Sequence, residues 1–248
     1  MKLAERGDAE AQFELGFMNH QGIEMPGDYN AALKWYRKSA RQKYAKAQNA
    51  IGIIYRLGHG VPEDEDIAAG WYHMAAEQGY DSAQLNLGLM YSNEKSAHRN
   101  LVKAFDWYMK AAEQGVAIAQ ASVGEMYYDG KGILPDSAKA LEWLKKAAKQ
   151  GNTTAQHNIG LIYYHGEGVA RDTQEGLAWA IVAKINGYDE IFDGKIACLE
   201  VPHVRKDVTT RAKEILQQIN PAGGIQLERV TNEDNWKDFF GTVGDAHN

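Results

Sequence analysis

A tryptophan recurs every 36 residues through most of this 248-residue chain. The segments around it repeat as well, since residues 68–79 read AAGWYHMAAEQG and residues 104–115 read AFDWYMKAAEQG. A fixed period between about 20 and 50 residues is typical of a solenoid, in which each repeat is one small unit that packs on its neighbours. The repeat therefore constrains the architecture before any local motif is considered. The five tryptophans are Trp35, Trp71, Trp107, Trp143 and Trp179.

Each repeat predicts two helices joined by a turn. The first helix contains Ala-Gln, then an aliphatic residue followed by Gly, then usually Tyr, at spacings that place them on one helical face. Glycine inside a helix costs about 0.5–1 kcal/mol relative to alanine, so its recurrence predicts the close approach of a neighbouring helix. The second helix carries the tryptophan among small residues, and we expect this side chain to act as a knob that packs into small gaps. The helical glycines are Gly16, Gly52, Gly88, Gly124 and Gly160.

Turn residues mark the helix ends. Gly-x-Gly turns are predicted to cap the first helices, and an acidic residue then caps the N-terminus of the second helix. A further glycine is predicted to end the second helix in the left-handed conformation. Lys43 takes that position in the first repeat, so we expect either a positive φ there, at a cost of roughly 1–2 kcal/mol, or a remodelled cap. The N-caps are Asp28, Asp64, Asp136 and Asp172, and the closing glycines are Gly79, Gly115, Gly151 and Gly187.

The period divides the chain into segments. Residues 1–6 resemble the last turn of a repeat and are interpreted as a remnant or an N-terminal cap. Residues 187–222 are interpreted as a degenerate capping repeat with helices at Ile191–Leu199 and Asp207–Ile219, and residues 223–248 as an irregular tail. The five full repeats are expected at residues 7–42, 43–78, 79–114, 115–150 and 151–186.

Together these marks resemble the Sel-one-like repeat family, relatives of the tetratricopeptide repeats. In words, the family pattern is Ala-Gln, Leu-Gly, Tyr, Gly-x-Gly-Val, Asp, Ala, Trp-Tyr and Ala-Ala-x-Gln-Gly, and residues 47–79 match nearly every element. The resemblance implies an all-α, right-handed α/α superhelical solenoid of five 36-residue helix-turn-helix repeats with a degenerate C-terminal capping repeat. It also implies a non-catalytic adaptor role in protein complexes, without any shared ligand.

Composition narrows the classes of function. A net charge of −6 argues against a nucleic-acid partner, which needs a dense basic face. No apolar run approaches the roughly 18 residues of a membrane span. The single Cys198 is compatible with a reducing compartment. As written, the chain is expected in the cytoplasm; it would be periplasmic or secreted if a signal peptide had been removed. We expect a monomer.

No residue pattern predicts catalysis or metal binding. The Gly-x-Gly turns follow helices rather than strands, so they are interpreted as helix caps and not phosphate loops. The acidic run at residues 63–66 lacks the spaced oxygens of a calcium loop, and the eight histidines show no metal-binding spacing. Nothing assembles a nucleophile, a base and an orienting group. We therefore expect a non-enzymatic protein without cofactor or metal.

The positions where the repeats differ are the candidates for partner recognition. In α-solenoids the first helix lines the concave surface, and binding surfaces vary while the scaffold repeats. We predict a groove with apolar patches and polar edges that binds a protein or peptide. Side chains at 13, 49, 85, 121 and 157 are expected to be exposed, whereas packing between first helices is an equal alternative at 17, 53, 89 and 161. The candidate residues are Phe13, Phe17, His20, Asn49, Arg56, Leu85, Leu89, Ala121, Glu125, Tyr128, His157 and Tyr164.

Two further hypotheses accompany this one. A narrower version is a bacterial inhibitor or immunity protein that occludes a secreted effector. A different class is a carbohydrate- or envelope-polymer-binding module, which would use Tyr36, Tyr128 and Tyr164 as exposed stacking platforms.

Overall fold

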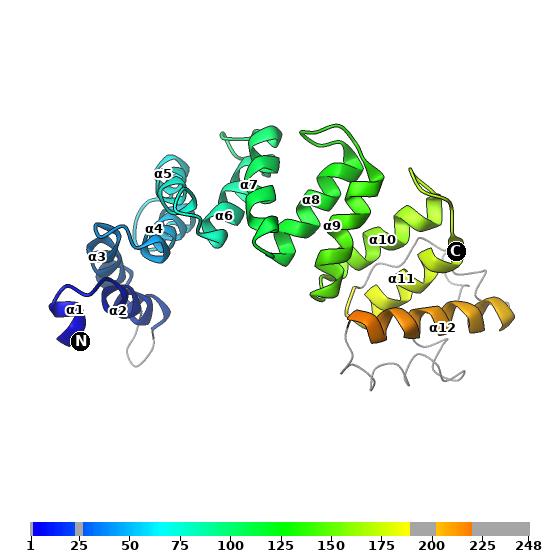
Figure 1. Cartoon of the computed structure of the whole chain (residues 1–248). Coiled ribbons are helices and arrows are strands. Elements are labelled where there is room, and N and C mark those ends of the chain that lie inside the picture. Colours follow the sequence, from blue (N-terminus) through cyan, green and yellow to red (C-terminus); the bar gives the residue numbers. More distant parts are fainter. Residues whose placement is uncertain (1, 23–26, 189–201, 220–248) are drawn as a thin grey trace, which may run out of the picture. The chain divides into compact units, whose positions relative to one another are not determined.

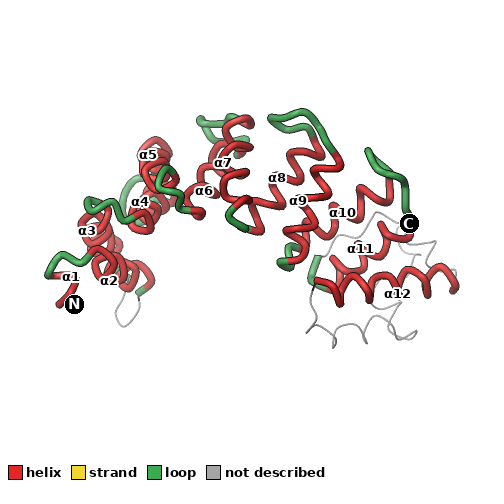
Figure 2. Tube along the Cα trace, viewed as in Figure 1, coloured by secondary structure: helices red, strands yellow, loops and turns green. Residues whose placement is uncertain are grey.

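The computed structural model describes residues 2–22, 27–188 and 202–219, and within these ranges the chain forms twelve helices and no strand (Figures 1 and 2). The expected helix at Ile191–Leu199 and the tail at 223–248 lie outside the described residues. The helices are α1 (Lys2–Glu5), α2 (Ala9–Gln21), α3 (Tyr29–Ala40), α4 (Ala45–Leu57), α5 (Glu65–Ala76), α6 (Asp81–Ser92), α7 (Leu101–Glu113), α8 (Ala117–Asp129), α9 (Ser137–Lys149), α10 (Thr153–His165), α11 (Thr173–Ile185) and α12 (Pro202–Ile219).

The chain divides into two compact units, residues 1–116 and 117–248. In the first unit α2 pairs with α3, α4 with α5 and α6 with α7, and α3 then packs on α4 and α5 on α6. In the second unit α8 pairs with α9 and α10 with α11, and α9 packs on α10. These helix pairs are the predicted repeats. We call the first helix of each repeat helix A (α2, α4, α6, α8, α10) and the second helix B (α3, α5, α7, α9, α11).

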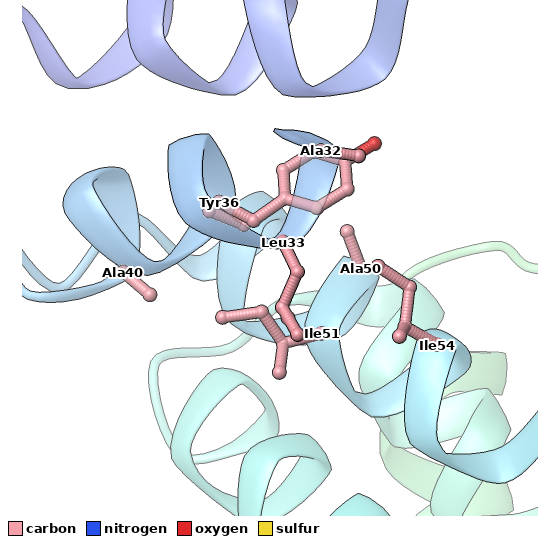
Figure 3. Close-up of a cluster of buried hydrophobic side chains, with 8 residues drawn as sticks. Ala32, Leu33, Tyr36, Ala40, Ala50, Ile51 and Ile54 are labelled. Carbon is pink, nitrogen blue, oxygen red and sulfur yellow. The ribbon is translucent and has the colours of Figure 1, made fainter. Parts of the chain in front are cut away.

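The hydrophobic core lies between successive helices. Figure 3 shows Leu33 of α3 beside Ile51 of α4, and Tyr36 and Ile54 belong to the same cluster of buried side chains. Alanines such as Ala32 fill the narrow space beside them. This arrangement explains the small residues of the repeat, because they allow the helices to approach closely.

The helical glycines do mark close contacts, as predicted. A Cβ on Gly52 would lie 2.6 Å from Cδ1 of Tyr72, and a Cβ on Gly124 would lie 2.6 Å from Cγ of Leu144. The side chain seated on each of these glycines is the residue that follows the tryptophan, so the tryptophan is not the knob at these contacts, although Trp179 is itself buried. Trp35 is instead half-buried, with Nζ of Lys38 3.8 Å from its ring centroid.

The helix caps follow the sequence prediction. Each of the four predicted aspartates accepts a hydrogen bond from a backbone N–H in the first turn of its helix B. Asn100 does the same for α7, in the repeat that lacks both the glycine turn and the aspartate. Lys43 adopts a φ of 62°, and within the described part of the chain no other non-glycine residue has a positive φ. The strained alternative for Lys43 is therefore confirmed.

A chain of amides joins the repeats. Within a repeat, Nε2 of Gln78 donates to Oε1 of Gln48 at 2.6 Å. Between repeats, Nε2 of Gln84 donates to the carbonyl oxygen of Ala76, at the end of the preceding helix B, at 3.2 Å. Gln12 makes the same bond to Ala4, so α1 takes the place of a preceding helix B. The other within-repeat pairs are Gln42–Gln12, Gln114–Gln84, Gln150–Gln120 and Asn186–Gln156.

Helix α12 packs on α11, where a capping element is expected. Nε and Nη2 of Arg211 donate to the two carboxylate oxygens of Glu175 at 2.6 and 3.2 Å. Buried Val208, Ile215 and Leu216 supply the apolar contact. The amphipathic helix predicted at Asp207–Ile219 is thus part of α12.

Candidate partner-binding surface

The candidate surface consists of three rows of side chains on the helices A. We name them by position along each helix. The first row is Phe13, Asn49, Leu85, Ala121 and His157; the middle row is Phe17, Ile53, Leu89, Glu125 and Leu161; the end row is His20, Arg56, Ser92, Tyr128 and Tyr164. The rows run over α2, α4 and α6 in the first unit and over α8 and α10 in the second.

The first row is more buried than expected. Asn49 and Ala121 are only 7% and 5% exposed, so the expectation of exposure is wrong for these two residues. The reason is contact between neighbouring helices A: Nδ2 of Asn86 on α6 donates to Oδ1 of Asn49 on α4 at 2.9 Å. Leu85 is half-buried.

The aromatic members of the first row also take part in packing. The Phe13 ring centroid lies 5.6 Å from that of Tyr36 and 5.5 Å from that of Tyr44, so Phe13 covers the core. His157 is half-buried and stacks on Tyr188 at 4.4 Å. Substitutions at Phe13 would therefore change stability as well as any surface property.

The middle row presents apolar side chains in the first unit. Phe17 is 39% exposed and Leu89 is 40% exposed, while Ile53 between them in sequence is half-buried. The ring centroids of Phe17 and Phe13 lie 6.4 Å apart. A water-exposed phenylalanine and leucine on helices of one unit are the side chains here most suited to apolar contact with a partner.

In the second unit the middle row carries a carboxylate. Nδ2 of Asn158 on α10 donates to Oε1 of Glu125 on α8 at 3.1 Å. Burial raises the pKa of Glu125, and the nearby Asp129 adds to this effect, whereas Lys131 and the Asn158 hydrogen bond oppose it. The ionised form is therefore held at a cost in free energy.

In the first unit the end row lies next to tyrosine hydroxyl groups of helix B. The Tyr108 hydroxyl and Oγ of Ser92 are 2.8 Å apart, and the Tyr36 hydroxyl lies 3.5 Å from Nδ1 of His20. Burial raises the pKa of Tyr72, and the positive charge of Arg56 partly offsets this effect. Tyr36 itself is 1% exposed, so the expectation that it forms an exposed stacking platform is wrong.

In the second unit the tyrosines lie in the end row itself and not on helix B. Leu144 and Ala180 replace the helix B tyrosine, and the end row itself holds Tyr128 and Tyr164, both half-buried. Tyr164 lies beside Arg171, whose guanidinium carbon is 5.9 Å from the ring centroid.

Two of the Gly-x-Gly turns touch the end row of the preceding repeat. Nδ1 of His59, in the turn after α4, lies 3.3 Å from Nε2 of His20 on α2. The Tyr128 hydroxyl donates to Oε2 of Glu167, in the turn after α10, at 2.5 Å. Sequence reasoning treated these turns as caps alone and missed the contact. The signal was the variable residue between the two glycines.

These contacts change the acidity of the groups involved. Burial, followed by the nearby His59, lowers the pKa of His20. Burial and the hydrogen bond to Glu167 raise the pKa of Tyr128. Among the described residues, no group of three or more His, Cys, Asp or Glu side chains is placed to hold a metal ion. In the same part of the chain no helix is both long and apolar enough to cross a membrane.

Comparison with known proteins decides the family. The family model of the Sel1 repeat matches residues 9–44, 45–80, 81–116, 117–152 and 153–188. The chain belongs to the Sel1 repeat family. Proteins with Sel1 repeats generally mediate protein–protein interactions, and their fold is generally a non-catalytic scaffold. No match was found among curated proteins.

Solved structures agree with the Sel1 repeat assignment. This chain is similar to c5321, a protective antigen of uropathogenic Escherichia coli strains with an SLR fold, at 32% identity and a TM-score of 0.80 over 93% of this chain. The match spans 50% of the c5321 chain. A Sel1 repeat protein from Oxalobacter formigenes matches at 38% identity and a TM-score of 0.64, over 73% of this chain and 74% of that one. These likenesses support an all-α solenoid built from Sel1 repeats.

Proposed function

We propose that this chain is a non-catalytic scaffold that binds a protein or peptide partner on the exposed parts of its helix A rows. The observation that supports the proposal is that the residues between the helices repeat, whereas the residues of the helix A rows vary. The framework of glutamines, glycines and caps repeats, whereas the rows change from repeat to repeat and leave Phe17 and Leu89 exposed to about the same extent. Variable residues on a repeated scaffold are typical of a recognition surface.

The chemistry of the rows suggests how such a surface would work. Exposed apolar side chains supply affinity when they are buried against a partner, and surrounding polar groups contribute mainly to specificity. In the first unit, Phe17 and Leu89 would be the anchors and Arg56 a polar neighbour. In the second unit, Glu125, Tyr128 and Tyr164 would offer polar and aromatic contacts.

The experiment is a pull-down from lysate of the source organism, with bound proteins identified by mass spectrometry. The baits are the parent chain, a Phe17→Glu/Leu89→Glu variant, and a Val102→Glu control on α7, where Val102 is 58% exposed but lies on helix B. Circular dichroism confirms that each bait is folded. We expect a protein that the parent and the control capture and the double variant loses. Equal capture by all three baits would contradict binding on these rows.

A narrower form of the proposal is an inhibitor or immunity protein for a secreted bacterial effector. A gene for such an effector beside the gene of this chain, and co-purification of the two products, would support it. An effector whose activity is unaffected by a molar excess of this chain would contradict it.

A carbohydrate-binding module is the second candidate, favoured by the partial exposure of Tyr128 and Tyr164 on neighbouring helices A. Aromatic rings at such positions can stack on sugars. Glycan-array binding that is lost in Tyr164→Ala would support this function. Glycan binding that is unchanged in Tyr164→Ala and Tyr128→Ala would exclude these two platforms.

A further inference from the structure

A basic region separates the acidic parts of the first unit. Residues 29–62 contain neither Asp nor Glu, although the chain as a whole has a net charge of −6. The exposed cations at its centre lie on α3, in the turn after it and at the start of α4. We call them the basic surface: Lys34, Arg37, Lys38, Arg41, Lys43 and Lys46.

Positions on the helix bring these charges together. Lys34 and Lys38 are four residues apart on one face of α3, and Arg41, the C-cap residue in helical conformation three residues after Lys38, continues this face. Arg37 donates to the Tyr55 hydroxyl at 2.8 Å, and Lys38 covers the Trp35 ring. Within the described residues, no ion pair neutralises any of the six.

The other repeats serve as internal controls. At the position of Lys43 they have glycine: Gly79, Gly115, Gly151 and Gly187. At the position of Lys34 they have Gly70, Asp106, Glu142 and Ala178, and at the position of Arg41 they have Glu77, Glu113, Lys149 and Ile185. The scaffold therefore does not require positive charge at these sites.

Two of the cations occupy positions that the local backbone disfavours, one because of its conformation and one because of the helix dipole. Lys43 occupies a left-handed conformation, φ 62°, that favours glycine. Lys46 lies in the first turn of α4, where the helix dipole disfavours a positive charge. Residues kept in strained or unfavourable settings are candidates for a functional role.

We propose that the basic surface binds an acidic segment of a protein partner. Helix α3 has 12 residues. Such a helix is about 18 Å long, which matches about six residues of extended peptide. A short acidic segment fits this length. A long polyanion, such as duplex nucleic acid, would extend beyond it and meet the acidic remainder of the chain.

This proposal is independent of the helix A rows, because the basic surface lies mainly on a helix B and the turn that follows it. Loss of binding at Phe17 and Leu89 would leave it intact, and loss of binding at the basic surface would leave the rows intact. The two surfaces can therefore fail separately.

The probe is a fluorescein-labelled hexaglutamate peptide, with binding followed by fluorescence anisotropy at ionic strengths of about 0.05 M and about 0.15 M. The test variant of the full chain is Lys38→Glu/Arg41→Glu. The matched control is Lys146→Glu/Lys149→Glu, which changes the equivalent positions of α9. Both variants remove a lysine whose Nζ lies 3.8 Å from a tryptophan ring centroid and change the net charge equally.

We expect the test variant to bind about tenfold more weakly than the parent, and the control to bind within about twofold of it. Lys43→Gly supplies a second readout: binding should weaken about twofold while the melting temperature rises, since glycine relieves the backbone strain. A purely structural role for Lys43 would not weaken binding.

Three results would overturn the proposal. The parent could fail to bind the peptide even at the lower ionic strength. The test and control variants could lose binding equally, which would indicate a general charge effect. A single-stranded oligonucleotide of similar length, or vesicles of phosphatidylcholine and phosphatidylserine, could bind more tightly than the peptide at the basic surface and so identify a different class of partner.

Discussion

Nε2 of Gln78, near the end of one helix B, donates to Oε1 of the buried Gln48 on the helix A of the same repeat, 2.6 Å away. Gln48 in turn donates to the carbonyl oxygen of Ala40, which ends the preceding helix B. One side chain therefore serves two helices besides its own. The Ala40 carbonyl also accepts from the Lys43 N–H and Gln78 also donates to the Met74 carbonyl, so loss of the Gln48 amide would remove two hydrogen bonds but leave neither partner unpaired.

Gln48→Ala is expected to lower the free energy of unfolding by about 1–3 kcal/mol, since it removes two hydrogen bonds and opens a small cavity. Urea unfolding followed by far-UV circular dichroism measures the change. Gln174→Ala, at an exposed position of α11, is the control and should stay within about 0.5 kcal/mol of the parent. Equal changes in the unfolding free energy of the two variants would contradict a stabilising role for the buried Gln48 amide.

Lys43→Gly is expected to stabilise the chain by about 1 kcal/mol, because glycine adopts the observed φ of 62° without strain. Lys34→Gly, at an exposed position inside α3, is expected to destabilise it by about 0.5–1 kcal/mol through the lower helix propensity of glycine. Thermal unfolding of the two variants should therefore move in opposite directions. A lower melting temperature for Lys43→Gly would contradict the strain argument.

Gly52→Ala and Gly70→Ala also form a matched pair. A Cβ at Gly52 would lie 2.6 Å from the Tyr72 ring, whereas a Cβ at Gly70, inside α5, meets nothing within 4 Å. Overpacking should make Gly52→Ala destabilising by about 1–3 kcal/mol despite the better helix propensity of alanine. Gly70→Ala should be stabilising by about 0.5–1 kcal/mol. Stabilisation by both changes would refute the close contact at Gly52.

His20 predicts a dependence of stability on pH. Its pKa is lowered in the folded chain, so the stability that it contributes is present above the pKa of the unfolded state, about 6.5, and is lost as the pH falls through the folded value. Unfolding free energies at about pH 7.5 and about pH 5.5 should therefore differ more in the parent than in His20→Gln. His165→Gln, an exposed histidine at the end of α10, is the control. An identical pH dependence in the parent and His20→Gln would rule out this contribution.

For Glu125 we expect the opposite dependence of stability on pH. Its pKa is raised by burial, so its ionised form destabilises the folded chain above the unfolded value of about 4.3, and this penalty disappears on acidification. Glu125→Gln keeps an oxygen for Asn158 and should be more stable than the parent near neutral pH, with the difference shrinking toward about pH 4. Asp106→Asn, exposed on α7, should show no such gain. A loss of stability in Glu125→Gln near neutral pH would contradict the burial argument.

Sequence reasoning reached the framework because the framework repeats. Trp35 and its four equivalents set the period, and the aspartate caps, the helical glycines and the strained Lys43 all followed from general rules for helix ends. Errors arose where two helices share a surface. The exposure of Asn49 depends on how closely α6 approaches α4, and a single helix pattern carries no information about that distance.

The candidate surface was harder to predict for the same reason. Tyr36 follows the tryptophan on a helical face that a periodic pattern leaves ambiguous, and the structure buries it beneath α2. The contact of His59 with His20 joins residues of different repeats through a turn, so it depends on stacking geometry. Position within a repeat predicts which residues vary, whereas stacking decides which of them reach the surface.

The amide chain has a consequence for the growth of such proteins. Gln48 and Gln84 stand 36 residues apart, and each donates to the alanine carbonyl that ends the helix before it. Excision of residues 45–80 as a block would bring Gln84 opposite the Ala40 carbonyl. The same hydrogen bond between repeats could then form again. Chain length is therefore a modular variable: duplication or loss of whole repeats changes the surface offered to partners without a new kind of joint.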